Sequence, residues 1–109
     1  MNGPVALGEL LLRLWQEILI DGRTEVELEG TALHVGRTRS QGLRTVGFSV
    51  EGRRFEGIEQ NPLKTSRWAK MAQAGSRIMQ FRCNGRYIAN VADGRLTRYP
   101  SWRSMELPD

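Results

Sequence analysis

The sequence predicts an α+β protein with a mainly antiparallel β-sheet, an N-terminal helix, and a second helix between the fourth and fifth of about seven short strands. Three observations predict this fold class. Apolar side chains recur with the helical period over residues 5–20, and the period changes to two from Arg23 onward. Successive apparent strands are joined by turns that contain glycine, at Gly30, Gly52, Gly85 and Gly94.

Length and composition predict one soluble domain. A chain of 109 residues matches the size of a single core, and its 39% hydrophobic and 26% charged residues are close to the globular average. We expect one domain over residues 1–109, with a helix at 1–22, a β-rich body at 23–99 and a tail at 100–109. No apolar run reaches the roughly 18 to 20 residues that a membrane-spanning helix needs, so we expect no membrane partner.

The first helix is amphipathic, with its polar side chains on one face and Asp21-Gly22 as its end. Its apolar arc spans roughly 200°, which is wider than the roughly 100° stripe that packing on one core requires. The arc consists of Leu7, Leu10, Leu11, Leu14, Trp15, Ile18 and Leu19. We therefore expect a second structure to cover the extra width.

Two hairpins and a helix are expected next. Glu25, Glu27 and Glu29 alternate with apolar residues in the first hairpin, which gives it an acidic outer face. A polar segment at 37–42 leads to the second hairpin, which turns at Glu51-Gly52. A helix over about 62–75 then follows Asn61-Pro62.

The last third predicts a three-stranded meander over residues 77–99, because Asn84-Gly85 and Asp93-Gly94 are strong signals for two-residue hairpin turns. Two-residue turns fix the register of the strands. The expected cross-strand neighbours are Phe81 with Ile88, Ile88 with Tyr99, Ile78 with Val91, Val91 with Leu96, and Arg82 with Tyr87. We expect Met79, Phe81, Ile88 and Tyr99 to face the core, and the end with Arg82, Tyr87 and Arg98 to lie partly in water.

The residue inventory argues against an enzyme. The chain has one histidine, His34, and one cysteine, Cys83, so the two residue types cannot build a structural zinc cluster or an intrachain disulfide. These two residues lie in separate halves without a local catalytic signature, and Lys64-Thr65 lacks the glycine of a phosphate loop. We expect no metal and no cofactor. A lone cysteine and the absence of a basic signal region indicate a cytoplasmic protein.

One segment resembles short uncharacterised bacterial proteins. The resemblance covers residues 53–99 and is carried by Glu59-Gln60-Asn61-Pro62, Ser66-Arg67-Trp68-Ala69-Lys70, Met79-Gln80-Phe81-Arg82, Gly85-Arg86-Tyr87-Ile88-Ala89 and Asp93-Gly94. It implies that this segment is a recurring module. It implies no activity and no functional residue.

Charge is distributed unevenly along the chain. Residues 1–60 hold 7 basic and 9 acidic side chains, whereas residues 61–109 hold 9 basic and 3 acidic ones. A basic surface with tyrosines suits nucleic acid, by phosphate contacts and base stacking, or an acidic protein. The candidate binding residues are Lys64, Arg67, Lys70, Arg82, Arg86, Tyr87 and Arg98. The alternative is a solvated face, partly neutralised by the glutamates of the first hairpin.

A second surface is the wide apolar arc of the first helix. Its candidate interface residues are Leu10, Leu12, Trp15 and Leu19. They would serve a homodimer or an adaptor that docks on another protein. The alternative is that the helix is buried on two sides within its own chain. In the tail, we expect Trp102 to cover a sheet edge.

Overall fold

The computed structural model describes residues 6–60 and 77–109, and it confirms an α+β fold with antiparallel sheets. Helix α1 (Leu7–Trp15) continues as the π-helical η1 (Gln16–Ile20). The other helix in the described residues, α3 (Pro100–Ser104), follows the last strand, where the sequence analysis expects only a tail. The helix expected over about 62–75 lies outside the described residues.

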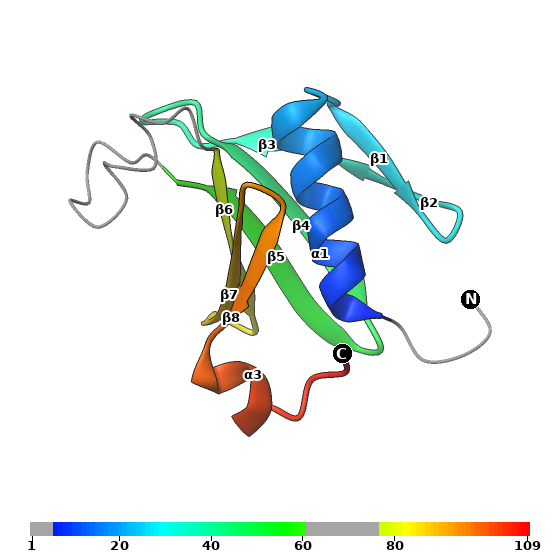
Figure 1. Ribbon diagram of the computed structural model, residues 1–109. Coiled ribbons are helices and arrows are strands. Elements are labelled where there is room, and N and C mark those ends of the chain that lie inside the picture. The colour runs from blue at the N-terminus through cyan, green and yellow to red at the C-terminus, as the bar shows by residue number, and fades with distance from the viewer. Residues whose placement is uncertain (1–5, 61–76) are drawn as a thin grey trace.

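The described residues form eight strands in two sheets (Figure 1). The two-stranded sheet pairs β1 (Glu25–Leu28) with β2 (Thr31–His34). The six-stranded sheet follows chain order, with β3 (Gly36–Arg37), β4 (Arg44–Val50), β5 (Arg53–Glu59), β6 (Ile78–Cys83), β7 (Arg86–Ala92) and β8 (Arg95–Arg98). The sequence predicts about seven strands, and β3 is the one that it does not predict. This strand is only two residues long, so no alternation of apolar and polar residues marks it.

All four predicted hairpins are present, and their turns share one geometry. Both residues of the Asn84-Gly85 turn have positive φ, at 50° and 84°, and the other three turns repeat this pattern. These angles define type I′ turns, whose twist matches that of paired strands. Asparagine, aspartate or glutamate holds the first position and glycine the second in every case.

A β-bulge changes the register that two-residue turns predict. Arg82 pairs with Tyr87 as expected, but Phe81 pairs with Ala89 because the register shifts between Phe81 and Arg82. The extra residue is Ile88, so the expected pairing of Phe81 with Ile88 is wrong. A bulge sends two consecutive side chains of one strand to the same side, and both Ile88 and Ala89 are fully buried.

The bulge also reassigns residues between the two faces of the meander. Beyond it, Ile78 pairs with Ala92 and not with Val91, although Val91 does pair with Leu96 as expected. Alternation then places Val91 on the inner face, which carries the core, and Tyr99 on the outer face. The expectation that Tyr99 faces the core is therefore wrong.

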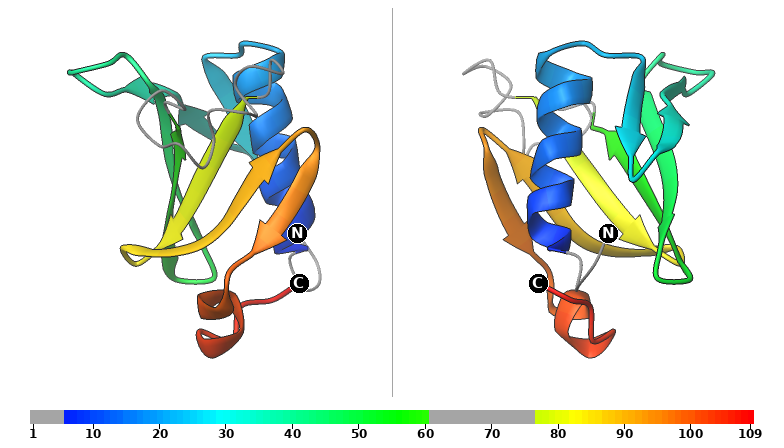
Figure 2. Two further views of the ribbon diagram at one scale, coloured as in Figure 1. Left: turned by 60° about the vertical axis from the view of Figure 1, so that its left-hand side comes forward. Right: turned by 90° about the vertical axis from the view of Figure 1, so that its right-hand side faces the viewer.

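The core lies between α1 and the inner face of the six-stranded sheet, and the hairpin β1–β2 lies on another side of the helix (Figure 2). The buried helical side chains are Leu7, Leu11, Leu14, Trp15, Ile18 and Leu19. The two sheets explain the wide apolar arc, since the helix packs against β6, β7 and β8 while η1 contacts β1. Within the described residues, no helix is long and apolar enough to cross a membrane.

Two arginines close the carboxyl end of η1. The Arg44 side chain donates to the Ile18 carbonyl oxygen at 2.7 Å, and the Arg77 side chain donates to the Leu19 carbonyl oxygen at 3.0 Å. Helix ends leave such carbonyl groups without a partner inside the helix. Glu59 joins the two arginines, because one carboxylate oxygen accepts the Arg44 main-chain N–H at 3.1 Å and the other pairs with Arg77.

Candidate nucleic-acid interface

A charged and aromatic row crosses the outer face of β5, β6 and β7. Glu56, Arg82 and Tyr87 are direct cross-strand neighbours. An Arg82 Nη2–Glu56 Oε2 ion pair spans 3.1 Å, and the Arg82 guanidinium lies 5.7 Å from the centre of the Tyr87 ring. Tyr87 is 45% exposed, so part of this large side chain is open to a partner.

A hydrogen-bonded cluster forms a second row beside the first. The Tyr99 hydroxyl oxygen accepts an N–H from Asn90 at 2.9 Å and another from Gln80 at 3.2 Å. Since this oxygen accepts twice, the Tyr99 O–H proton remains available for a further acceptor. Gln80 and Asn90 pair directly across β6 and β7, so the three side chains are held in fixed positions on the outer face.

We call these five residues, Arg82, Tyr87, Gln80, Asn90 and Tyr99, the tyrosine face. Its charge is smaller than the sequence suggests, because Glu56 offsets the Arg82 charge. The Arg82 Nε atom is buried and has no hydrogen-bond partner among the described residues. Arg86, which begins β7, is exposed and makes no ion pair within the described part of the chain.

Arg98 lies away from the tyrosine face. It pairs with Ala89, whose side chain is in the core, so Arg98 points from the inner face. Its guanidinium lies 4.8 Å from the centre of the Trp102 ring. The predicted grouping of Arg82, Tyr87 and Arg98 at one end of one face is wrong, because the bulge at Ile88 moves Ala89 and Arg98 to the inner face.

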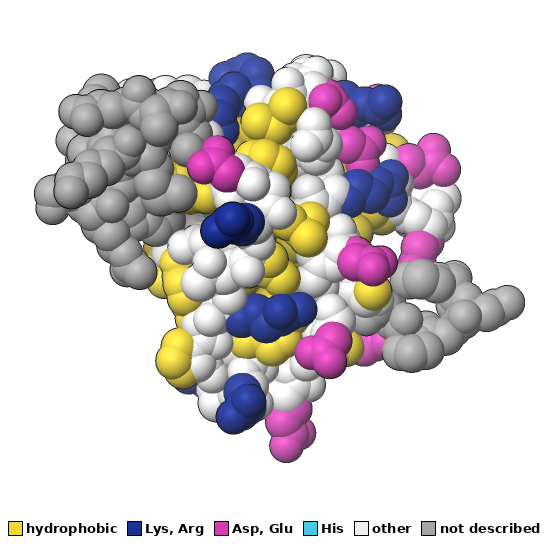
Figure 3. Space-filling view, in the orientation of Figure 1, with side chains coloured by type: hydrophobic (Ala, Val, Ile, Leu, Met, Phe, Trp, Pro, Cys, Tyr) yellow, Lys and Arg dark blue, Asp and Glu magenta, His cyan; other side chains and the backbone are white. Residues whose placement is uncertain are grey.

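Exposed arginines follow the edge strand β8 into α3. On the face seen in Figure 3, dark-blue side chains succeed one another over these two elements, whereas most acidic side chains lie over α1 and the β1–β2 hairpin. Arg95, Arg98 and Arg103 form this arginine edge. None of the three makes an ion pair with a described residue.

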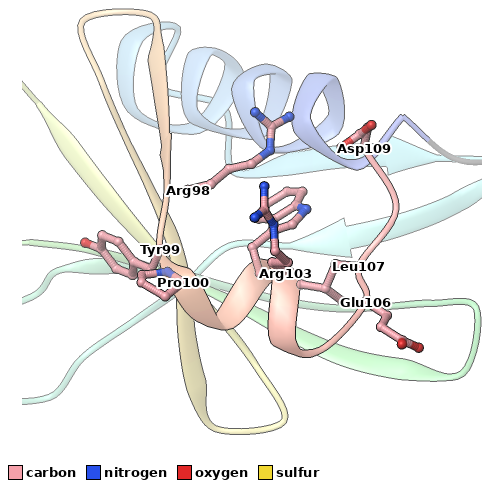
Figure 4. A pocket seen from close by; sticks show the side chains of 8 residues that line it. Arg98, Tyr99, Pro100, Arg103, Glu106, Leu107 and Asp109 are labelled. Atoms are coloured by element: carbon pink, nitrogen blue, oxygen red, sulfur yellow. The ribbon is translucent and has the colours of Figure 1, made fainter.

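The arginine edge ends at a pocket of about 650 Å³. Arg98, Tyr99, Pro100, Trp102, Arg103, Glu106, Leu107 and Asp109 line it (Figure 4). Trp102 is buried and its Nε1 atom has no acceptor among the described residues. This site was not predicted from the sequence, although Pro100 in the first turn of a helix is a recognised start signal.

The other candidate binding residues lie either outside the described residues or on the apolar arc of the first helix. Lys64, Arg67 and Lys70 lie outside the described residues. In the apolar arc, Trp15 and Leu19 are buried within the chain, and Leu10 and Leu12 are partly buried. Leu10 borders a groove of about 850 Å³ between α1, the β1–β2 hairpin and the turn from β4 to β5.

The single cysteine, Cys83, is buried, whereas the single histidine, His34, is exposed. Cys83 is fully buried, and this burial raises the pKa of its thiol, although the nearby Arg53 charge acts in the opposite direction. His34 is exposed on β2, in the other sheet, with Glu25 3.7 Å away. Within residues 6–60 and 77–109, no group of three or more histidine, cysteine or acidic residues could hold a metal ion.

Comparisons of the chain with protein-family models, with curated proteins and with solved structures found no match. The surfaces of the chain that suit a partner are therefore the tyrosine face, the arginine edge and the groove at Leu10. Of the candidate binding residues, the structure brings together Arg82 and Tyr87 and separates both from Arg98.

Proposed function

We propose that the protein is a non-enzymatic binding module that holds single-stranded nucleic acid on the tyrosine face. The observation that carries this proposal is the exposed Tyr87 ring, fixed beside Arg82 on an ordered sheet. Aromatic side chains on a sheet surface bind unpaired bases by stacking, which is worth about 1 to 3 kcal/mol per base. Single strands expose their bases for such contacts.

The polar cluster supports the same proposal. Nucleobases present donors and acceptors on their edges, and the amides of Gln80 and Asn90 offer both kinds of group. The Tyr99 hydroxyl adds a donor, because its oxygen already accepts two N–H groups. The arrangement therefore favours a planar ligand with polar edges over a purely apolar one.

The surrounding charge favours a polyanion. Residues 77–109 contain six arginines and three acidic residues. Arg86 and Arg95 are exposed at the two ends of the β7–β8 region, and both lack ion pairs with described residues. Arginine binds phosphate with paired hydrogen bonds, so these side chains suit a backbone that passes the tyrosine face.

Replacing Tyr87 with alanine is expected to weaken binding of a fluorescent dT10 oligonucleotide roughly tenfold, because one base loses its stacking partner. Tyr87→Phe should retain most of the affinity, since the ring remains. Fluorescence anisotropy at two salt concentrations measures both values, and affinity should fall as salt rises. Failure of the natural protein to bind single-stranded oligonucleotides at low salt would refute the proposal.

A second candidate function is a protein-interaction or assembly subunit, including a homodimer or an adaptor. One observation favours it: Leu10 borders the groove at α1, where Leu28, Leu33 and Val50 are also only partly buried. Partly exposed apolar side chains around a groove are typical of docking sites.

Leu10→Glu is the test of this second function. The variant should raise the dissociation constant of an assembly at least about tenfold, because it places a charge in an apolar contact. Light scattering after size exclusion measures the mass across a concentration series, and circular dichroism checks that the variant is folded. A protein that is monomeric at every concentration, and that retains each captured partner after Leu10→Glu, contradicts the assembly function.

A further inference from the structure

The pocket at the end of the arginine edge is lined by side-chain hydrogen-bond donors that have no acceptor among the described residues. The side chains of Arg98 and Arg103 make no hydrogen bond or ion pair with described residues. Figure 4 shows both guanidinium groups directed into the same space, from β8 and from α3. The buried Trp102 Nε1 is a further donor without an acceptor. Arg98 and Arg103 are exposed, and charged donors that have no acceptor within the chain favour an anionic ligand that accepts hydrogen bonds.

The aromatic ring fixes one of these donors in place. The Arg98 guanidinium lies over the Trp102 ring at 4.8 Å, and Trp102 itself is 4% exposed. A cation held on an aromatic face loses little freedom when it binds an anion. Gly8 leaves room for this placement, because a Cβ atom there would lie 2.8 Å from Arg98 Nη2.

The number and arrangement of donors select among anions. A carboxylate has two oxygens and one charge, and a single arginine can satisfy it with two parallel hydrogen bonds. Two guanidinium groups supply two positive charges and donors from two directions. A phosphate monoester carries close to two negative charges at neutral pH and three terminal oxygens, so it matches this pair better.

Two carboxylates also line the pocket and oppose an anion. Figure 4 shows the Glu106 carboxylate directed away from Arg98 and Arg103, on the far side of Leu107. Asp109 lies near the start of α1, where its main-chain oxygen accepts the Gly8 N–H at 2.7 Å. Neither side chain forms an ion pair with the two arginines. Their charge lowers the affinity of the pocket for phosphate without occupying its donors.

We propose that the pocket formed by Arg98, Trp102 and Arg103 binds a phosphate monoester group. The group comes either from the end of a nucleic-acid strand, which rests on the proposed function, or from a free phosphate compound. The pocket and the tyrosine face share Tyr99, and Ser101 Oγ donates to the Tyr87 carbonyl oxygen, but Arg98 points from the inner face of the sheet whereas Tyr87 lies on the outer face. A strand on Tyr87 would therefore have to pass around the edge strand β8 to place its terminal phosphate in the pocket.

Inorganic phosphate is the first probe, and the indole N–H signal of Trp102 is the readout. Titration followed by ¹H–¹⁵N NMR should shift this signal, which is assigned by its loss in Trp102→Phe. The double variant Arg98→Gln/Arg103→Gln should weaken phosphate binding at least about tenfold, because both charged donors are removed. Arg39→Gln, a matched change of an exposed arginine outside the pocket, the arginine edge and the tyrosine face, should leave it unchanged.

Three results would overturn the proposal: no shift at millimolar phosphate, equal binding by the double variant, or an equal loss in Arg39→Gln. Arg103→Gln alone replaces the double variant if the latter unfolds, because the Arg103 side chain makes no hydrogen bond or ion pair with described residues. Glu106→Gln should tighten phosphate binding, since it removes a nearby negative charge.

Oligonucleotides then identify the source of the phosphate. If the source is a strand, dT10 with a terminal phosphate should bind at least about fivefold tighter than dT10 without one, and the double variant should abolish this difference. Equal affinity of the two oligonucleotides, with phosphate still bound, assigns the pocket to a free phosphate compound. Phosphate binding without any oligonucleotide binding refutes the nucleic-acid function and leaves the pocket intact.

Discussion

Gly57→Ala is expected to lower the free energy of unfolding by about 1 to 3 kcal/mol, because it adds a methyl group to a filled core. A Cβ atom at Gly57 would lie 2.8 Å from Phe81 Cε1 and 2.9 Å from Met79 Sδ. Both neighbours are fully buried, and Phe81 pairs directly with Gly57 across β5 and β6. The ring and the thioether must therefore move together with their own neighbours. Urea unfolding measures the loss.

Gly47→Ala is the matched control for this prediction. Gly47 lies on the adjacent strand β4, and the group that its added Cβ would meet is the guanidinium of Arg54. Arg54 is exposed and its side chain can turn away, so the cost should stay within about 0.5 kcal/mol. Equal losses in the two variants would show that strand backbone preference, and not the packing of Phe81, sets the cost at Gly57.

The hairpins could be predicted because their turn residues act locally. A type I′ turn requires positive φ at both central residues, which Asn84-Gly85 and Asp93-Gly94 provide independently of the rest of the chain. The bulge at Ile88 could not be predicted in this way. It places Ile88 and Ala89 in the core together, and that arrangement depends on the packing of β7 against α1 and β6.

In the candidate site too, pairings that a turn determines could be predicted, whereas the facing of side chains beyond the bulge could not. Arg82 and Tyr87 lie next to the Asn84-Gly85 turn, before the bulge, so their pairing follows from the turn alone. Arg98 pairs with Ala89, as the two-residue turn at Asp93-Gly94 predicts, but the face to which both side chains point depends on the bulge, so the predicted grouping of Arg98 with Arg82 and Tyr87 was wrong. Its actual partner, Trp102, belongs to a short helix whose position is set by tertiary packing.

Glu59→Ala is expected to cost about 2 kcal/mol, because it leaves two groups without their acceptor: the Arg44 main-chain N–H and the Arg77 guanidinium. The full penalty for breaking a buried ion pair is about 3 to 5 kcal/mol. The loss should be smaller here, since the Arg77 side chain is 39% exposed and water can solvate its charge. Urea unfolding at constant pH measures it.

The comparison with Glu56→Ala separates this end of η1 from ordinary sheet electrostatics. Glu56 also pairs with an arginine across β5 and β6, but its side chain is 45% exposed and accepts no main-chain N–H among the described residues. Its loss should cost under about 1 kcal/mol. Glu59 differs because its two partners, Arg44 and Arg77, also donate to the last carbonyls of η1. If both variants lose the same stability, the Glu59 carboxylate does not hold that helix end, and the packing of Ile18 and Leu19 suffices.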